Sequence, residues 1–169
     1  MYELLSKRIK NADGEPEVFT YNSFPQAFRN QVFYILEDVL EPYSTYNENL
    51  WDIFEKKFCR EKGLKGMGYG KLQNGYGKSS IEKYFKDCDD IDFLDAIDYF
   101  FYLIDKKIRT IKPEYQYDYD SDGAINAAIA ELNYRFKQHN LGYEFANSQI
   151  ITIDSTFLHK TAVKPALKL

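Results

Sequence analysis

Residues that form covalent or metal cross-links are scarce in this sequence. Its 169 residues include two cysteines, Cys59 and Cys88, and two histidines, His139 and His159. Two cysteines do not make a disulfide framework, and so few of them suit a reducing compartment. Two histidines without a paired cysteine cluster do not make a structural zinc site. The sequence therefore predicts a protein with no metal and no cofactor.

Long apolar runs are missing as well. No stretch approaches the length that crosses a membrane. The basic pair Lys7-Arg8 is not followed by the apolar core of a secretory signal. These absences predict a cytoplasmic protein with no membrane contact. The chain is 44% hydrophobic and 17% aromatic, which is too apolar for disorder, and it is long enough for one domain with a full core.

Charge is unevenly distributed along the chain. The net charge of −4 excludes a globally basic nucleic-acid binder. Residues 55–86 nevertheless carry nine Lys or Arg against three Asp or Glu, a net of +6, between segments 1–54 at −5 and 87–122 at −7. The simpler interpretation is that these blocks neutralise one another in the fold. The alternative is that the basic block forms a nucleic-acid contact.

Apolar periodicity predicts a mainly α fold, a compact domain of about five to six helices with one small β-hairpin near residues 143–153. Helical spacing of apolar residues places helices at about 23–42, 47–62, 79–85, 89–113 and 122–140, and a last helix from Asp154-Ser155 onward. Ser23 with Gln26 is typical of a capping box, Ser79 is expected to cap the short helix, and Gly63 is expected to end the helix before it.

Aspartates are concentrated near the start of the helix expected from residue 89. They stand at positions 90, 92, 95 and 98, and Lys106, Lys107 and Arg109 follow at the far end. This order complements the helix dipole, which favours negative charge at the N-terminus and positive charge at the C-terminus. The pattern predicts a solvated, dipole-matched helix start.

A tandem Gly-Tyr-Gly-Lys sequence occupies residues 68–71 and 75–78. Leu72 stands where a P-loop needs glycine and no apolar strand precedes the segment, so a P-loop is excluded. The favoured interpretation is a pair of turns, with Asn74-Gly75 setting a tight hairpin. The alternative is an anion or nucleic-acid contact, since lysines and aromatic rings bind phosphates and stack on bases. The candidate residues for that contact are Arg60, Lys65, Tyr69, Lys71, Tyr76 and Lys78.

Other fragments of catalytic or metal motifs are incomplete. Residues 118–123 match the first half of a calcium loop, but the twelfth position is Ile129 instead of a bidentate Glu. Arg135 and His139 are separated by three residues, whereas the Arg–His signature of HEPN ribonucleases has at least four. We expect His139 to satisfy a helix C-terminus, and we expect Cys59 and Cys88 to be small buried side chains. No catalytic residue and no enzymatic activity are predicted.

Several segments, in order along the chain, resemble the AbiJ-type N-terminal domain of bacterial abortive-infection proteins. They are residues 17–21, 24–32, 50–54, 59–63, 93–97, 132–145, 150–155 and 158–167, of which Leu132–Phe145 is the clearest. The Gly-Tyr-Gly-Lys repeat is not a recognised feature of that family.

The resemblance implies a single domain over residues 1–169 that stands ahead of a C-terminal effector, often a HEPN-like ribonuclease. It implies a non-catalytic sensor or regulatory role in phage defence, and it carries over no catalytic residue. The apolar end from Val163 to Leu169 suggests that the chain is the front part of a longer protein. The expected partners are the effector domain and a second copy of the chain. Nucleic acid is the alternative partner.

Overall fold

The computed structural model describes residues 2–8, 24–41, 49–107, 121–146 and 149–152. Its elements are α1 (Leu5–Arg8), α2 (Gln26–Leu40), α3 (Leu50–Lys62), α4 (Gly77–Asp87), α5 (Asp90–Lys107), α6 (Ser121–Gln138), β1 (Tyr143–Ala146) and β2 (Gln149–Thr152). The prediction of a mainly α fold with one small hairpin is confirmed. The helix expected after Asp154 lies outside the described residues, as do residues 118–120 of the half calcium loop, whose other three residues begin α6.

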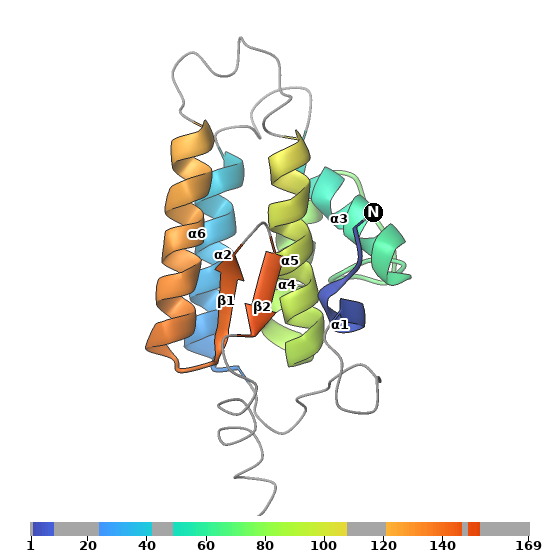
Figure 1. Cartoon of the computed structure of the whole chain (residues 1–169). Helices are drawn as coiled ribbons and strands as arrows, with labels where there is room; N and C mark the ends of the chain where they lie inside the picture. The colour runs from blue at the N-terminus through green and yellow to red at the C-terminus, as the bar shows by residue number, and fades with distance from the viewer. Residues whose placement is uncertain (1, 9–23, 42–48, 108–120, 147–148, 153–169) are drawn as a thin grey trace, which may run out of the picture.

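Figure 1 shows α2 and α6 side by side and antiparallel, with α5 next to them. The hairpin joins these helices, because β1 packs on α6 and β2 packs on α5. Its strands are antiparallel in the register Tyr143 to Thr152 and Ala146 to Gln149. Helix α3 lies on the other side of α5 and packs on α4, which also packs on α2. The short α1 lies against α5.

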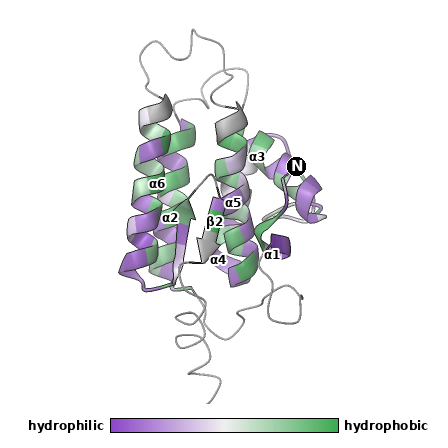
Figure 2. Ribbon diagram, viewed as in Figure 1, coloured by the Kyte–Doolittle hydropathy of each residue, from purple (hydrophilic) through white to green (hydrophobic). Residues whose placement is uncertain are grey.

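Phenylalanine dominates the centre of the core. Phe28 of α2 packs against Phe93 of α5 and Phe136 of α6, at centroid distances of 5.7 and 5.4 Å. Phe54 of α3 meets Phe100 of α5 edge-on at 5.5 Å. Such aromatic pairs are worth about 0.5–1.5 kcal/mol beyond the area that they bury. Figure 2 shows the hydrophobic faces of the helices turned toward one another.

The helix starts follow tertiary contacts more than local capping signals. Pro25 is the N-cap of α2 and no side chain caps it, while Gln26 donates to the Lys86 carbonyl instead of closing a capping box. Ser23, the predicted cap, lies outside the described residues. Helix α3 begins at Leu50, where the Asn49 side chain accepts from the Trp51 amide at 3.0 Å. It ends at Gly63 with φ 79°, as predicted from the sequence.

The predicted cap of α4 at Ser79 is wrong. The helix begins two residues earlier, at Gly77, whose amide donates to Asp52 Oδ1 of α3 at 2.8 Å. A carboxylate from a neighbouring helix thus accepts a hydrogen bond at the N-terminus of α4, where a local serine was expected to do so. Ser79 lies inside the helix, and its hydroxyl donates to the Tyr76 carbonyl at 3.1 Å.

Candidate functional site

Asp90, Asp95 and Asp98 of α5 form a buried row, which corrects the prediction of a solvated helix start, while Asp92 stays partly exposed. Asp95 and Asp98 have no exposed surface and Asp90 is 7% exposed. A carboxylate leaves water only where cations or donors compensate it. The compensation comes from other segments of the chain, which a pattern confined to one helix could not reveal.

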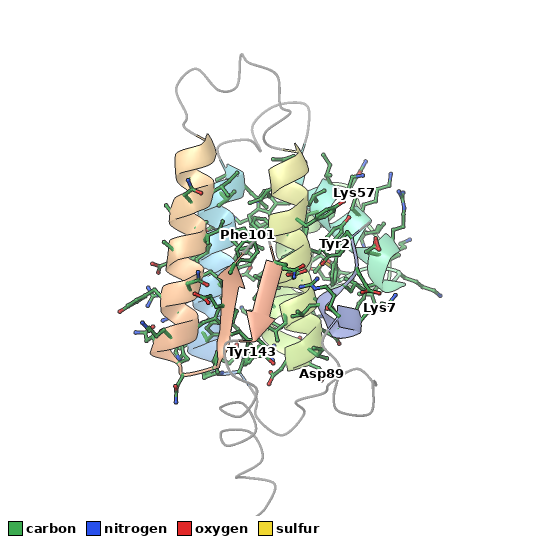
Figure 3. All side chains as sticks on the ribbon, viewed as in Figure 1. Tyr2, Lys7, Lys57, Asp89, Phe101 and Tyr143 are labelled. Carbon is green, nitrogen blue, oxygen red and sulfur yellow. The ribbon has the colours of Figure 1, made fainter. Side chains whose placement is uncertain are left out.

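Asp98 joins three segments. Its carboxylate accepts from the Tyr2 hydroxyl at 2.7 Å, from both terminal nitrogens of Arg8 at 2.8 and 2.9 Å, and from the Ile150 amide at 2.7 Å. Arg8 also donates to the Ile150 carbonyl at 3.2 Å. Burial alone would lower the pKa of Arg8, but the hydrogen bond and charge of Asp98 outweigh it and raise that pKa. Figure 3 shows Tyr2 beside α5.

Asp95 and Asp90 bind cations of α3 and α2. The Lys62 ammonium lies 2.5 Å from Asp95 and 2.8 Å from Asp92, and the Ser6 amide donates to Asp95 at 2.7 Å. Asp90 accepts from Arg29 and from the Phe24 amide, each at 2.9 Å. These contacts tie α1, α2 and α3 to α5, so the row is an internal scaffold.

Two carboxylates of α3 hold the glycine-rich connection between α3 and α4. Asp52 accepts from the amides of Gly75 and Gly77 at 2.7 and 2.8 Å. The buried Glu55 accepts from the Met67 amide at 3.0 Å and from the Ser80 hydroxyl at 2.5 Å. These three amides are therefore engaged by carboxylates of the protein and are not available to an external phosphate.

The connection contains the expected tight turn. The Tyr76 amide donates to the Gln73 carbonyl at 3.2 Å, and Gly75 has φ 86°, a conformation that favours glycine. A turn at Asn74-Gly75 is confirmed, but the described residues on either side of it form no strands, so the prediction of a hairpin there is wrong.

The six candidate residues for an anion contact fall into two groups. Lys78 bridges Glu37 and Glu41 at 2.8 and 2.7 Å. The hydrogen bonds to these carboxylates raise its pKa to about 12. Its charge is neutralised within the protein, so we remove it from the candidate site.

The other five candidates are exposed. They are Arg60, Lys65, Tyr69, Lys71 and Tyr76. Tyr69 and Tyr76 expose 40% and 54% of their surface. Lys83 of α4, which sequence reasoning missed, places its ammonium 5.5 Å from the centre of the Tyr69 ring. Lys56 lies one helical turn before Arg60 in α3. Together with Leu72 it lines a hollow of about 960 Å³. Both lysines belong to the basic block of residues 55–86, so the charge of that block was the sequence feature that could have indicated them.

We call this set the basic–tyrosine surface. It consists of Lys56, Arg60, Lys65, Tyr69, Lys71, Tyr76 and Lys83. These residues come from α3, from the connection after it and from α4. Contacts from Asp52 and Glu55 to the connection, and from Tyr69 to Ser79 and Lys83, bring the three segments together.

The histidine and the cysteines that the structure describes have structural surroundings. His139 follows the end of α6, and its Nε2 lies 2.9 Å from Gln31 Oε1. Burial raises the pKa of Cys59 and of Cys88 to about 12, so both thiols are protonated and unreactive at neutral pH. Within the described part of the chain, His, Cys, Asp and Glu form no group of three that could hold a metal ion.

A second concave feature lies between α2 and α6. It has a volume of about 440 Å³, and its lining includes three alanines of α6 together with Tyr34 and Arg135. Arg135 is bound to Glu131 and Gln138, at 2.7 and 2.9 Å. The groove is concave, but its charged residues are of both signs, so it has no strong potential of one sign.

The sequence model of the family described as AbiJ N-terminal domain 4 matches residues 3–168. The chain belongs to this family. The match covers nearly the whole sequence and both sides of the core, so the fold described above is that of an AbiJ N-terminal domain, a component of abortive-infection proteins. Comparison with curated proteins and with solved structures gives no match.

Among the described helices, none is both long and apolar enough to cross a membrane.

Proposed function

We propose that this AbiJ N-terminal domain is the non-catalytic sensor and regulator of a phage-defence protein. It acts on an effector domain carried by the same polypeptide, and a HEPN-like ribonuclease is the effector class that we expect. The observation that carries this proposal is the family match over residues 3–168. The description of the family as an N-terminal domain supports this arrangement.

The use of the polar groups in the described residues supports a regulatory role. The buried carboxylates at 55, 90, 95 and 98 are engaged in holding segments together. The two thiols are kept protonated by burial. A catalytic site instead needs a nucleophile or base that is poised near neutral pH and open to substrate.

The proposal is tested with the polypeptide that carries the domain, expressed in bacteria that are challenged with phage. Deletion of the domain is expected to uncouple the effector from infection, because the effector loses its control element. The uncoupling would be measured as toxicity without phage or as loss of protection, using growth curves and plaque counts. A deletion that leaves both toxicity and protection unchanged contradicts a regulatory role.

The non-catalytic part of the proposal has a separate test. Chain 1–169 alone is incubated with RNA and with DNA, and the products are resolved on denaturing gels. We expect the nucleic acids to stay intact. Cleavage that persists through repurification, and is lost on unfolding, would show an enzyme and overturn the proposal.

A further inference from the structure

The basic–tyrosine surface carries an excess of positive charge that the fold does not neutralise. Of the nine Lys and Arg residues in 55–86, Lys62, Lys78 and Lys86 have carboxylate partners. The other six have no carboxylate within ion-pair distance among the described residues. Five of them belong to the basic–tyrosine surface, namely Lys56, Arg60, Lys65, Lys71 and Lys83, and the sixth is the half-buried Lys57 of α3. In Figure 3 the labelled Lys57 projects from α3 on the side away from α6.

The acidic residues of the same segment offset only part of this charge, because three carboxylates face nine cations. Glu55 is buried against Met67 and Ser80, and Glu82 lies 3.9 Å from Lys86. Glu61 is the remaining carboxylate of residues 55–86. An unbalanced cluster of exposed cations produces a positive potential that attracts an anionic partner.

Exposed aromatic and apolar side chains lie in the same region. Five large hydrophobic side chains are exposed in the described part of the chain, and three of them, Tyr69, Leu72 and Tyr76, belong to the connection. Tyr69 presents its ring together with the Lys83 ammonium. Rings beside cations can stack on bases while the cations contact phosphates.

We propose that the basic–tyrosine surface binds single-stranded nucleic acid. This inference rests on the proposed function, since it names the class of molecule that the domain senses. The surface has cations from three segments for the phosphates, and Tyr69 and Tyr76 for unstacked bases. Duplex bases are already stacked on one another and offer no free face to these rings, so single strands fit better.

The contact is made by side chains and not by the glycine-rich backbone. Asp52 occupies the amides of Gly75 and Gly77 at the start of α4, and a phosphate there would meet a carboxylate. Lys78, which the sequence pattern included, is held by Glu37 and Glu41. Of the two lysines in the repeat, the proposed site therefore keeps Lys71 and excludes Lys78. It gains Lys83 of α4 and Lys56 of α3.

The experiment measures fluorescence anisotropy of chain 1–169 with a labelled oligouridylate of about 15 nucleotides, between roughly 0.05 and 0.2 M salt. Replacing Lys71 and Lys83 by alanine is expected to weaken binding. It should also reduce the slope of log affinity against log salt by about 0.7 for each phosphate that no longer meets a lysine. The matched control is Lys137→Ala, an exposed lysine of α6, which should leave binding unchanged. Figure 1 shows that α6 and α3 lie on different sides of α5.

Aromatic variants separate stacking from simple charge attraction. Tyr69→Ala and Tyr76→Ala are each expected to weaken binding about fivefold or more, whereas Tyr69→Phe and Tyr76→Phe retain a ring and should bind as the parent does. Far-ultraviolet circular dichroism confirms that each variant is folded. An equal loss in the Lys137→Ala control would overturn the assignment of the surface.

Competitors test the class of partner. Unlabelled single strands should displace the probe, while duplex DNA of equal charge and polyglutamate should compete weakly. No binding at low salt, or equal competition by polyglutamate or by duplex, overturns the proposal. The proposed function has its own readout in the domain deletion. An uncoupled effector together with absent oligonucleotide binding means that the domain regulates through another ligand.

Discussion

Asp98 shows how much one residue can depend on contacts that are distant in sequence. It lies in the middle of α5, has no exposed surface, and accepts from Tyr2, Arg8 and Ile150. Removing one partner from such a cluster leaves the others buried and unpaired, which costs more than the interaction itself contributes. The same residue therefore fixes the N-terminal segment and the second strand of the hairpin.

Asp98→Asn is expected to destabilise the protein by about 3–5 kcal/mol, because the Arg8 guanidinium loses its buried counter-charge. Urea unfolding followed by circular dichroism measures the change. Asp89→Asn is the matched control, since Asp89 is exposed just before α5 and asparagine caps a helix about as well as aspartate. A destabilisation below about 1 kcal/mol in Asp98→Asn would mean that the cluster adds little to stability.

At the scale of an element, α4 is positioned by its contact with α3. A Cβ on Gly77 would lie 2.5 Å from Asp52 Oδ1 and 2.6 Å from the Asp52 amide nitrogen. A Cβ on Gly68 would meet the Ser80 backbone at 2.5 Å. Glycine is required at these two positions by close approach of another backbone and not by turn geometry.

Gly77→Ala is expected to cost about 1–3 kcal/mol, because backbone atoms must move to admit the methyl group. Gly70→Ala is the control, as a Cβ there meets nothing within 4 Å. Thermal unfolding of the two variants beside the parent measures the difference. If Gly70→Ala lowers the melting temperature as much as Gly77→Ala, the close packing of α3 on α4 is not the cause.

Across the whole molecule, the fold forms ion pairs between part of the basic segment 55–86 and the acidic segments on either side of it. Lys62 and Lys78 of the basic block pair with Asp92, Asp95, Glu37 and Glu41 of the acidic ones. The rest of the basic block remains on the surface. The two interpretations of the block therefore apply to different residues, and the unpaired part is where we place the nucleic-acid contact.

Buried thiols and phenols predict a loss of stability at alkaline pH. Burial raises the pKa of Cys59 from 9.0 to about 12, and it raises that of Tyr99 to about 12. Between the unfolded and folded pKa values the native state holds more protons than the unfolded state, so stability falls as pH rises. The raised pKa of Lys62 acts in the same direction above its ordinary value of 10.5, because the unfolded lysine loses its charge first.

We expect the free energy of unfolding to decline from about pH 9, with Cys59 contributing up to about 1.4 kcal/mol per pH unit. Urea titrations between pH 7 and about 11 measure the decline. In Cys59→Ala the slope just above pH 9 should be smaller than in the parent, although the variant is less stable overall. An unchanged midpoint from neutral pH to about 11 would contradict this expectation.

Local periodicity and glycine chemistry carried most of the fold prediction. Helical spacing of residues such as Leu94, Ile97 and Leu132 defines buried faces because side-chain direction repeats every 3.6 residues, whatever the partner. The hairpin at 143–152 and the end of α3 at Gly63 follow from equally local rules. The sequence by itself also determined the positive charge of residues 55–86.

Only the tertiary structure decided which charges are paired and which are exposed. The aspartates of α5 look solvated in sequence, since their cations come from positions 8, 29 and 62. Lys78 and Lys71 occupy equivalent places in the repeat, yet only Lys78 has carboxylates in reach among the described residues. Whether a charge is free to meet a ligand depends on neighbours across space, and a linear pattern does not contain that information.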